Sequence, residues 1–286
     1  MRSERCTLPT PDDGKIELHW LEHGDASAEQ VVVCVHGLTR NARDFDRIAS
    51  ELASRGARVL AVDVSGRGGS TWLADPDRYA VSVYAGHLQA WLAALGLTSV
   101  DWLGTSMGGL IGMVVASSDD SPIRRLVLND VGAFVPKEAL APIGSYLGLD
   151  LQFSDLDSVE RHLRTIHAGF GRHIDDGWWR DLARHSSRKD GQAWRMHYDP
   201  AIKLPFTKLE ATDIDLWQLY DRIKCPALLL RGAESGLLPV EVAQEMTRRG
   251  PQAELATLLD CGHAPSLAER DQIEVVADWL CGPRSS

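Results

Sequence analysis

The chain has 286 residues, of which 44% are hydrophobic and 24% are charged, and its formal net charge is −10. This composition is typical of a folded globular protein, and the length allows one large core with a smaller insertion. The acidic balance, together with the lack of a basic patch interleaved with aromatic residues, excludes nucleic acid as an expected partner.

No leader or membrane-spanning pattern is visible in the sequence. Residues 1–6 have no apolar stretch of the kind a signal peptide requires. No uninterrupted apolar run approaches the roughly 18 residues that a membrane-spanning helix needs, so we expect no membrane association. The five cysteines are scattered and odd in number, which favours reduced thiols over a disulfide framework. We therefore expect a cytoplasmic protein.

Short apolar runs alternate with amphipathic stretches through the first part of the chain. The spacing of apolar residues predicts strands at Ile16–Leu21, Val31–Val35, Arg58–Val62, Val100–Leu103 and Leu126–Leu128. It predicts helices at Phe45–Ser54, Val83–Leu95 and Met107–Ser117. Because the strands are apolar throughout, the pattern indicates a mostly parallel sheet covered by helices on both faces.

The alternation stops at about Pro136 and returns after Trp217. The intervening stretch shows no clear strand and gathers many aromatic residues, so we expect a mostly helical insertion. Beyond it, we expect further elements at Pro226–Leu230, Val240–Met246, Ala253–Leu259 and Ile273–Leu280, of which the first and third are strands.

We therefore predict an α/β protein with an eight-stranded sheet. Its core would consist of residues 1–134 and 219–286, and residues 135–218 would form the insertion. The two ends of the chain are the segments expected to be loose.

The run Gly104-Thr105-Ser106-Met107-Gly108 fits the pattern Gly-x-Ser-x-Gly, directly after a predicted strand. In this motif a serine occupies a strained strand-to-helix turn that lifts its hydroxyl clear of the sheet. Glycine is needed on both sides because a side chain there would collide with the neighbouring helix or strand. Such a serine is a nucleophile if a histidine and a carboxylate reach it.

Four segments together resemble motifs of the α/β-hydrolase family, in the order that the family has them. They are His36–Leu38, Asp63–Ser70, Gly104–Gly108 and Cys261–Pro265. They are similar in turn to the oxyanion loop, the Gly-rich loop, the nucleophile elbow and the Gly-His loop before the last helix. The resemblance covers nearly the whole chain and implies the α/β-hydrolase fold, with the insertion as a helical cap.

The resemblance implies serine hydrolase chemistry. Ser106 would attack a carbonyl carbon after His263 takes its proton. The backbone N–H groups of Leu38 and Met107 would form the oxyanion hole. His36 is expected to shape this loop and to transfer no proton. The remaining histidines show no ligand spacing, so neither a metal nor a cofactor is expected.

The acid of the triad is the one member that the sequence leaves open. The family commonly places it after the seventh strand, where this chain has Ser235 and Gly236. Asp130, at the end of the sixth strand, is our first candidate, because some family members, including a group of haloalkane dehalogenases, carry their acid there. It could also merely cap the loop into the insertion. Glu234 is the alternative acid; otherwise no acid reaches His263, or Gly236 is an engineered or inactivating change.

The sequence thus predicts a serine hydrolase that cleaves a carboxylic ester or lactone through an acyl-enzyme on Ser106. The substrate would be a small molecule with an apolar acyl or aryl part. One alternative is hydrolysis of a C–C bond at the same site. Another is a binding protein that keeps the pocket and has lost the chemistry, which Gly236 would favour.

Overall fold

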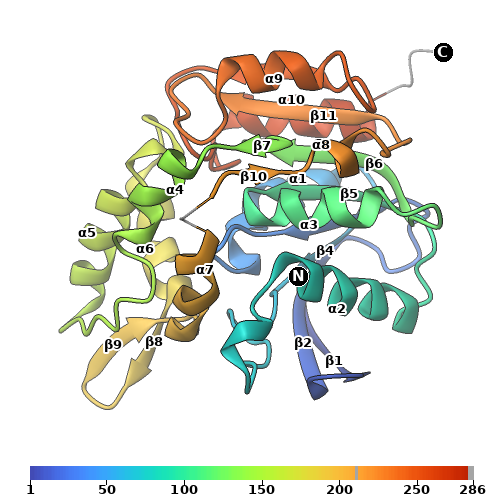
Figure 1. Cartoon of the computed structure of the whole chain (residues 1–286). Coiled ribbons are helices and arrows are strands. Elements are labelled where there is room, and N and C mark those ends of the chain that lie inside the picture. Colours follow the sequence, from blue (N-terminus) through green and yellow to red (C-terminus); the bar gives the residue numbers. More distant parts are fainter. Residues whose placement is uncertain (210–211, 283–286) are drawn as a thin grey trace.

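The computed structural model describes residues 1–209 and 212–282, and its centre is one eight-stranded sheet. The strands of this sheet are β1 (Arg2–Thr10), β2 (Gly14–His23), β3 (Val31–Val35), β4 (Arg58–Val62), β5 (Val100–Thr105), β6 (Ile123–Asn129), β11 (Ala227–Gly232) and β12 (Glu254–Leu258). They are ordered β1-β2-β4-β3-β5-β6-β11-β12 (Figure 1). The first two pairs are antiparallel and the other neighbours are parallel. The predicted fold class is confirmed.

Helices cover the sheet on both faces. They are η1 (Ala42–Phe45), α1 (Asp46–Ser54), η2 (Pro76–Arg78), α2 (Val81–Ala94), α3 (Met107–Ala116), α8 (Trp217–Tyr220), α9 (Val240–Met246) and α10 (Arg270–Cys281). Successive side chains of a strand point to opposite faces, so β3 serves two cores. Val32 and Cys34 pack with α1 and α10, while Val33 and Val35 pack with α2 and α3.

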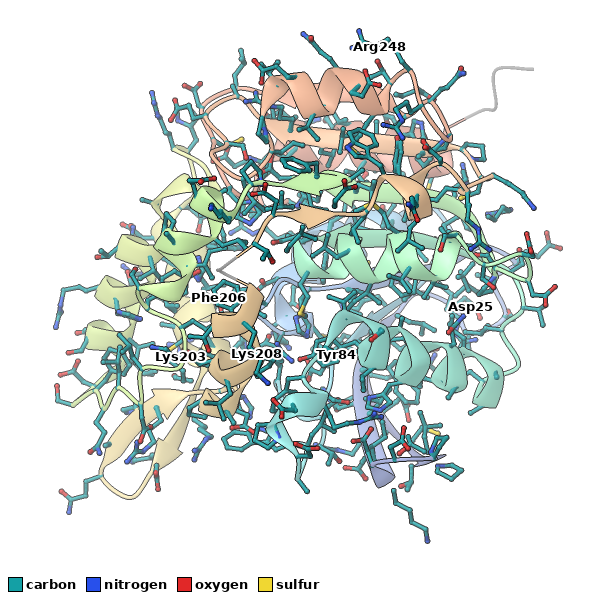
Figure 2. All side chains as sticks on the ribbon, in the orientation of Figure 1. Asp25, Tyr84, Lys203, Phe206, Lys208 and Arg248 are labelled. Carbon is teal, nitrogen blue, oxygen red and sulfur yellow. The ribbon has the colours of Figure 1, made fainter. Side chains whose placement is uncertain are left out.

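The insertion lies beside the sheet and forms a cap of four α-helices with short strands (Figure 1). Its elements and the strands that flank it are β7 (Phe134–Val135), α4 (Lys137–Gly144), α5 (Leu156–Ile166), η3 (Ala168–Phe170), α6 (Asp176–Ser186), β8 (Ser187–Asp190), β9 (Ala193–Met196), η4 (Pro200–Ile202), α7 (Lys203–Leu209) and β10 (Ile214–Asp215). Tyr84 of α2 and Phe206 of α7 are buried, whereas Asp25, Lys208 and Arg248 are exposed (Figure 2).

One of our expectations about the elements is wrong, and the expectation of a mostly helical cap is correct but incomplete. The N-terminal end is not loose, because Arg2–Thr10 pairs along its whole length with β2. The cap region also contains strands, since β8 and β9 form an antiparallel hairpin and β7 pairs with β10. The hairpin turns at Gly191, whose φ of 62° suits glycine. The C-terminal residues 283–286, also expected to be loose, lie outside the described residues.

Within residues 1–209 and 212–282, no helix is both long enough and apolar enough to cross a bilayer.

Candidate active site

Ser106 occupies the sharp turn between β5 and α3. Its backbone has a φ of 52° and a ψ of −114°, a conformation that is strained for any residue other than glycine. A Cβ atom on Gly104 would lie 2.3 Å from the Gly108 carbonyl oxygen, and one on Gly108 would lie 2.0 Å from the Val35 carbonyl oxygen. The two glycines therefore permit the close approach of β3, β5 and α3 that raises the serine.

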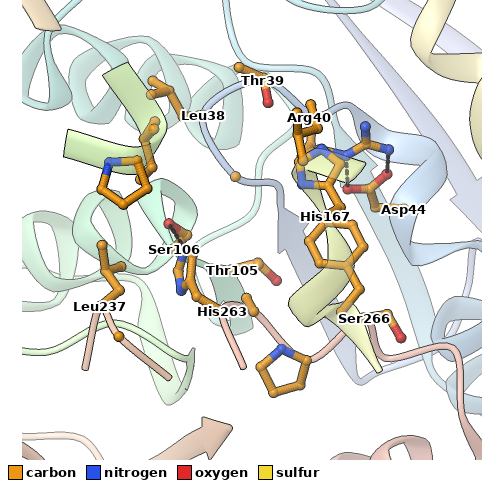
Figure 3. A pocket seen from close by; sticks show the side chains of 18 of the residues that line it. Leu38, Thr39, Arg40, Asp44, Thr105, Ser106, His167, Leu237, His263 and Ser266 are labelled. Atoms are coloured by element: carbon orange, nitrogen blue, oxygen red, sulfur yellow. Dashed lines mark hydrogen bonds and ion pairs between the residues drawn. The ribbon is translucent and has the colours of Figure 1, made fainter. Parts of the chain in front are cut away.

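His263 lies between Ser106 and Asp130. Its Nε2 is 3.0 Å from Ser106 Oγ, and its Nδ1 is 2.8 Å from Asp130 Oδ2. The carboxylate of Asp130 is fully buried, whereas the His263 side chain is 23% exposed. The cap also contacts this loop, because the N–H of Gly262 donates to the carbonyl of Gly169 at 2.7 Å. The structure thus brings together a serine, a histidine and a carboxylate from three separate segments (Figure 3 shows the first two).

Asp130 is held from several sides. Its Oδ1 accepts the N–H of Gly232 at 2.8 Å, and its Oδ2 accepts the hydroxyl of Ser235 at 2.6 Å. The same hydroxyl oxygen accepts the N–H of Leu238 at 3.1 Å. A buried carboxylate requires such partners. From the sequence, Ser235 is only a residue that cannot be the acid, because no local signal indicates its contact with a carboxylate 105 positions away.

The alternative acid, Glu234, does not reach His263. Its side chain is 55% exposed and forms an ion pair with Arg172 of the cap. Of the two acids named from the sequence, the structure therefore places Asp130 and not Glu234 at the histidine. The possibility that no acid reaches His263 is contradicted by the same contact. Gly236 lines the cavity described below, and a Cβ atom there would meet nothing within 4 Å.

Met107 follows Ser106 directly, and Leu38 lines the same cavity as Ser106. Met107 is the first residue of α3, where an N–H has no partner within the helix. Arg67 joins the two segments: its Nε donates to the Leu38 carbonyl at 2.8 Å and its Nη2 lies 3.7 Å from Met107 Sδ. The Arg67 side chain is fully buried and also donates to the carbonyl of Ser65 and to the hydroxyl of Tyr84.

His36 fixes the start of the same loop. Its Nε2 accepts the N–H of Val64 at 3.0 Å, and its Nδ1 donates to the carbonyl of Gly37 at 2.8 Å. Burial lowers the pKa of His36 to about 4, so the ring is neutral at pH 7. These contacts match the shaping role that we expected for His36.

A cavity of about 620 Å³ opens over Ser106 and His263. Its wall is largely apolar and is formed by the cap, by the segment after β3 and by the loops after β11 and β12. Apolar residues of this wall include Pro136, Ile143, Ile166, Phe170, Trp178 and Leu237. A volume of this size is in the range of sites for small organic ligands, roughly 300–1,000 Å³.

A serine, a histidine and an aspartate also meet at the N-terminal hairpin. Ser3 Oγ is 2.9 Å from His19 Nε2, and His19 Nδ1 is 2.6 Å from Asp63 Oδ2. Ser3, however, is exposed on the edge strand β1 and does not line the cavity. These contacts alone therefore do not mark a candidate active site; Ser106 differs from Ser3 by its elbow conformation and by the cavity that it lines.

No group of three or more histidine, cysteine, aspartate or glutamate side chains that could hold a metal occurs among the residues that the structure describes.

Comparison with known proteins gives consistent results. Residues 30–269 match a family model described as alpha/beta hydrolase fold. A Cupriavidus necator protein named 3-hydroxybutyrate-oligomer hydrolase is 42% identical over 287 residues, which cover 97% of this chain and 96% of that protein. An X-ray structure from Rickettsia typhi superposes with a TM-score of 0.92 at 32% identity, covering 99% of this chain and all of the other. An alpha/beta hydrolase from Novosphingobium aromaticivorans has a TM-score of 0.84 at 34% identity, covering 97% and 98%. The chain therefore belongs to the α/β-hydrolase fold family.

Proposed function

We propose that this protein hydrolyses carboxylic ester bonds, with Ser106 as nucleophile, His263 as general base and Asp130 as the acid of the triad. The observation that carries the proposal is the unbroken line of contacts from Ser106 Oγ through His263 to Asp130, at the wall of a ligand-sized cavity.

In the first half of the reaction, His263 Nε2 takes the proton of Ser106 as Oγ attacks the ester carbonyl. The N–H groups of Leu38 and Met107 receive the negative charge that develops on the carbonyl oxygen. Asp130 accepts the Nδ1–H of His263, which selects the tautomer that leaves Nε2 free and stabilises the imidazolium that forms.

The leaving alcohol then takes the proton from His263, which completes the first half and leaves the acyl group on Ser106. In the second half, a water molecule gives a proton to His263 and attacks the acyl carbon, and His263 passes that proton to Ser106 Oγ as the acid is released.

The cavity and the relatives support this choice of substrate class. The largely apolar wall suits an ester or lactone with an apolar acyl or aryl part, and the Cupriavidus necator relative is named for oligomers of 3-hydroxybutyrate. Short oligoesters of hydroxy acids are therefore the first compounds to test. All five cysteines are free thiols, which fits a reducing compartment such as the cytoplasm.

The experiment compares hydrolysis of p-nitrophenyl esters and of 3-hydroxybutyrate dimer by the parent and by four variants. Ser106→Ala should lower kcat by a factor on the order of 10⁶, and Asp130→Asn by roughly 10⁴, because the wrong histidine tautomer is then favoured. Glu234→Gln should stay within about threefold of the parent. Ser3→Ala is the matched control, because Ser3 makes the same type of contact outside the cavity.

Three results would contradict the proposal. A parent that binds esters without turnover, and whose Ser106 a fluorophosphonate does not label, would indicate a binding protein. Cleavage of β-diketone-like substrates in preference to esters, established by product analysis, would indicate a C–C hydrolase. A loss of activity in Glu234→Gln but not in Asp130→Asn would show that Glu234, and not Asp130, is the acid of the triad.

A further inference from the structure

The cavity has a polar end away from Ser106, formed around Arg40 (Figure 3). The Nε and Nη2 atoms of Arg40 donate to the two carboxylate oxygens of Asp44 at 2.9 and 2.6 Å. The Arg40 side chain is only 5% exposed. Its third nitrogen, Nη1, is buried and has no hydrogen-bond partner in the described part of the chain. Buried donors are nearly always paired, so this nitrogen indicates a partner that is absent from the protein itself.

His167 is the second unpaired group at this end of the cavity. Its ring stacks on Phe170 with the ring centres 4.3 Å apart, and its buried Nε2 has no hydrogen-bond partner among the described residues. Burial, with a smaller contribution from the charge of Arg40, lowers the pKa of His167 well below its ordinary value. The ring is therefore neutral and offers a hydrogen bond without a charge.

Tyr146 completes the polar end. Its ring meets the ring of His167 edge-on, with the centres 6.3 Å apart, and it lines the same cavity. Burial raises the pKa of Tyr146 to about 12, so the hydroxyl keeps its proton and can donate it in a hydrogen bond.

The charges at this end do not suit an anion. Arg40 is neutralised by the two-point contact with Asp44, and His167 is uncharged. Glu138 lines the same cavity and adds no positive charge for a carboxylate to pair with. A neutral oxygen acceptor, such as an ester carbonyl, can accept from Arg40 Nη1 and from the Tyr146 hydroxyl, and from His167 when its Nε2 carries the proton, without bringing a second charge into a buried site.

We propose that Arg40, His167 and Tyr146 form a subsite for a second carbonyl in the acyl part of the substrate, so that the enzyme prefers diesters and oligoesters to simple alkyl esters. The inference rests on the proposed ester hydrolysis at Ser106. It assigns the apolar wall to the hydrocarbon between two ester groups, and the polar end to recognition of the second group.

The test uses two p-nitrophenyl esters with the same leaving group and nearly the same shape. One is the 3-acetoxybutyrate, which has a second ester; the other is the 3-methylhexanoate, in which methylene groups replace that ester. The expected ratio of kcat/KM, diester over isostere, is at least tenfold for the parent. The hydrogen adipate ester supplies an anionic comparison and should be the poorest of the three.

The variants remove the donors without leaving a charge unpaired. Arg40→Met combined with Asp44→Leu deletes the ion pair as a unit, and Tyr146→Phe and His167→Phe delete single polar groups. We expect the ratio to fall below threefold in the double variant and by two- to fivefold in each single variant. Ser3→Ala, a change outside the cavity, should leave the ratio unchanged. If the double variant does not fold, as judged by circular dichroism, the two single variants decide.

A ratio near one in the parent, or an unchanged ratio in the variants, would overturn this inference while leaving ester hydrolysis intact. Preference for the adipate ester would also overturn it, in favour of an anion site. If the parent hydrolyses none of the three esters, it is the proposed function that fails. The ratio of kcat/KM for the two esters measures recognition of the second carbonyl alone, because both esters undergo the same chemistry at Ser106.

Discussion

At the scale of single residues, the hydroxyl of Ser235 helps to fix the position of the Asp130 carboxylate. Its hydroxyl donates to the same carboxylate oxygen that faces His263. We expect Ser235→Ala to lower kcat by about tenfold, because a hydrogen bond to a charged group is worth roughly 1.5–3 kcal/mol. Ser235→Thr, which keeps the hydroxyl, should recover most of the loss. Steady-state hydrolysis of a p-nitrophenyl ester measures both.

A second measurement tests whether the effect acts through Asp130. If it does, Ser235→Ala should have little further effect in an Asp130→Asn background, because the charged acceptor is already gone. Fully additive losses would show that Ser235 acts on the fold of the loop after β11 and not on the acid.

Single residues also show what the sequence could and could not predict. Ser106 and His263 were found because local motifs surround them. Asp130 was one of several alternatives, since its position beside His263 depends on the pairing of β6 with β11. The contacts of Ser235 and Arg67 were not foreseen, because each links segments far apart in the chain and neither belongs to a motif that specifies its partner.

At the scale of elements, the turn from β5 to α3 has no room for larger side chains at its two glycines. Gly104→Ala and Gly108→Ala should each destabilise the protein by more than about 3 kcal/mol, because the added Cβ would meet backbone atoms that cannot move aside. Gly86→Ala is the matched control. Gly86 is exposed within α2, its Cβ would meet nothing within 4 Å, and alanine favours a helix by about 0.5–1 kcal/mol.

Urea unfolding of the three variants measures these differences. A Gly108→Ala protein as stable as the parent would contradict the close approach of α3 to β3, and with it the elbow geometry described here.

The elements that sequence reasoning missed share a physical cause. In β1 only Leu8 is buried, so the strand lacks the apolar alternation that identifies strands elsewhere in the chain. The hairpin of β8 and β9 is likewise largely polar, and its Gly191-Gln192 turn is the one local signal available. A strand that is held mainly by backbone pairing to a neighbour needs few apolar residues, so its sequence lacks the apolar pattern that identifies a strand buried on both faces.

For the molecule as a whole, buried histidines make stability depend on pH. Unfolding lets His36 bind a proton with an ordinary pKa near 6.5, whereas in the folded protein its pKa is about 4. The contribution of His36 to the free energy of unfolding is thus fully present above pH 6.5. It decreases as the pH drops towards 4, by up to roughly 3 kcal/mol. His167 acts in the same direction. Asp46 acts in the opposite direction, since burial raises its pKa to about 6.

Urea unfolding between pH 7 and pH 4.5 measures this dependence. His36→Gln, whose side-chain carbonyl can still accept the N–H of Val64, should make the stability less dependent on pH in this range. His173→Gln is the control, because His173 is exposed. An unchanged pH dependence in His36→Gln would show that His36 is not the group that titrates.

The open space at Gly236 bears on how the acid of a triad can change its place during evolution. An added Cβ there meets no atom within 4 Å, so a side chain can begin at this position while Asp130 stays where it is. If an aspartate at position 236 also reaches His263, a chain with both acids can lose either one and keep a complete triad. The two arrangements of the triad would then be connected without an inactive intermediate.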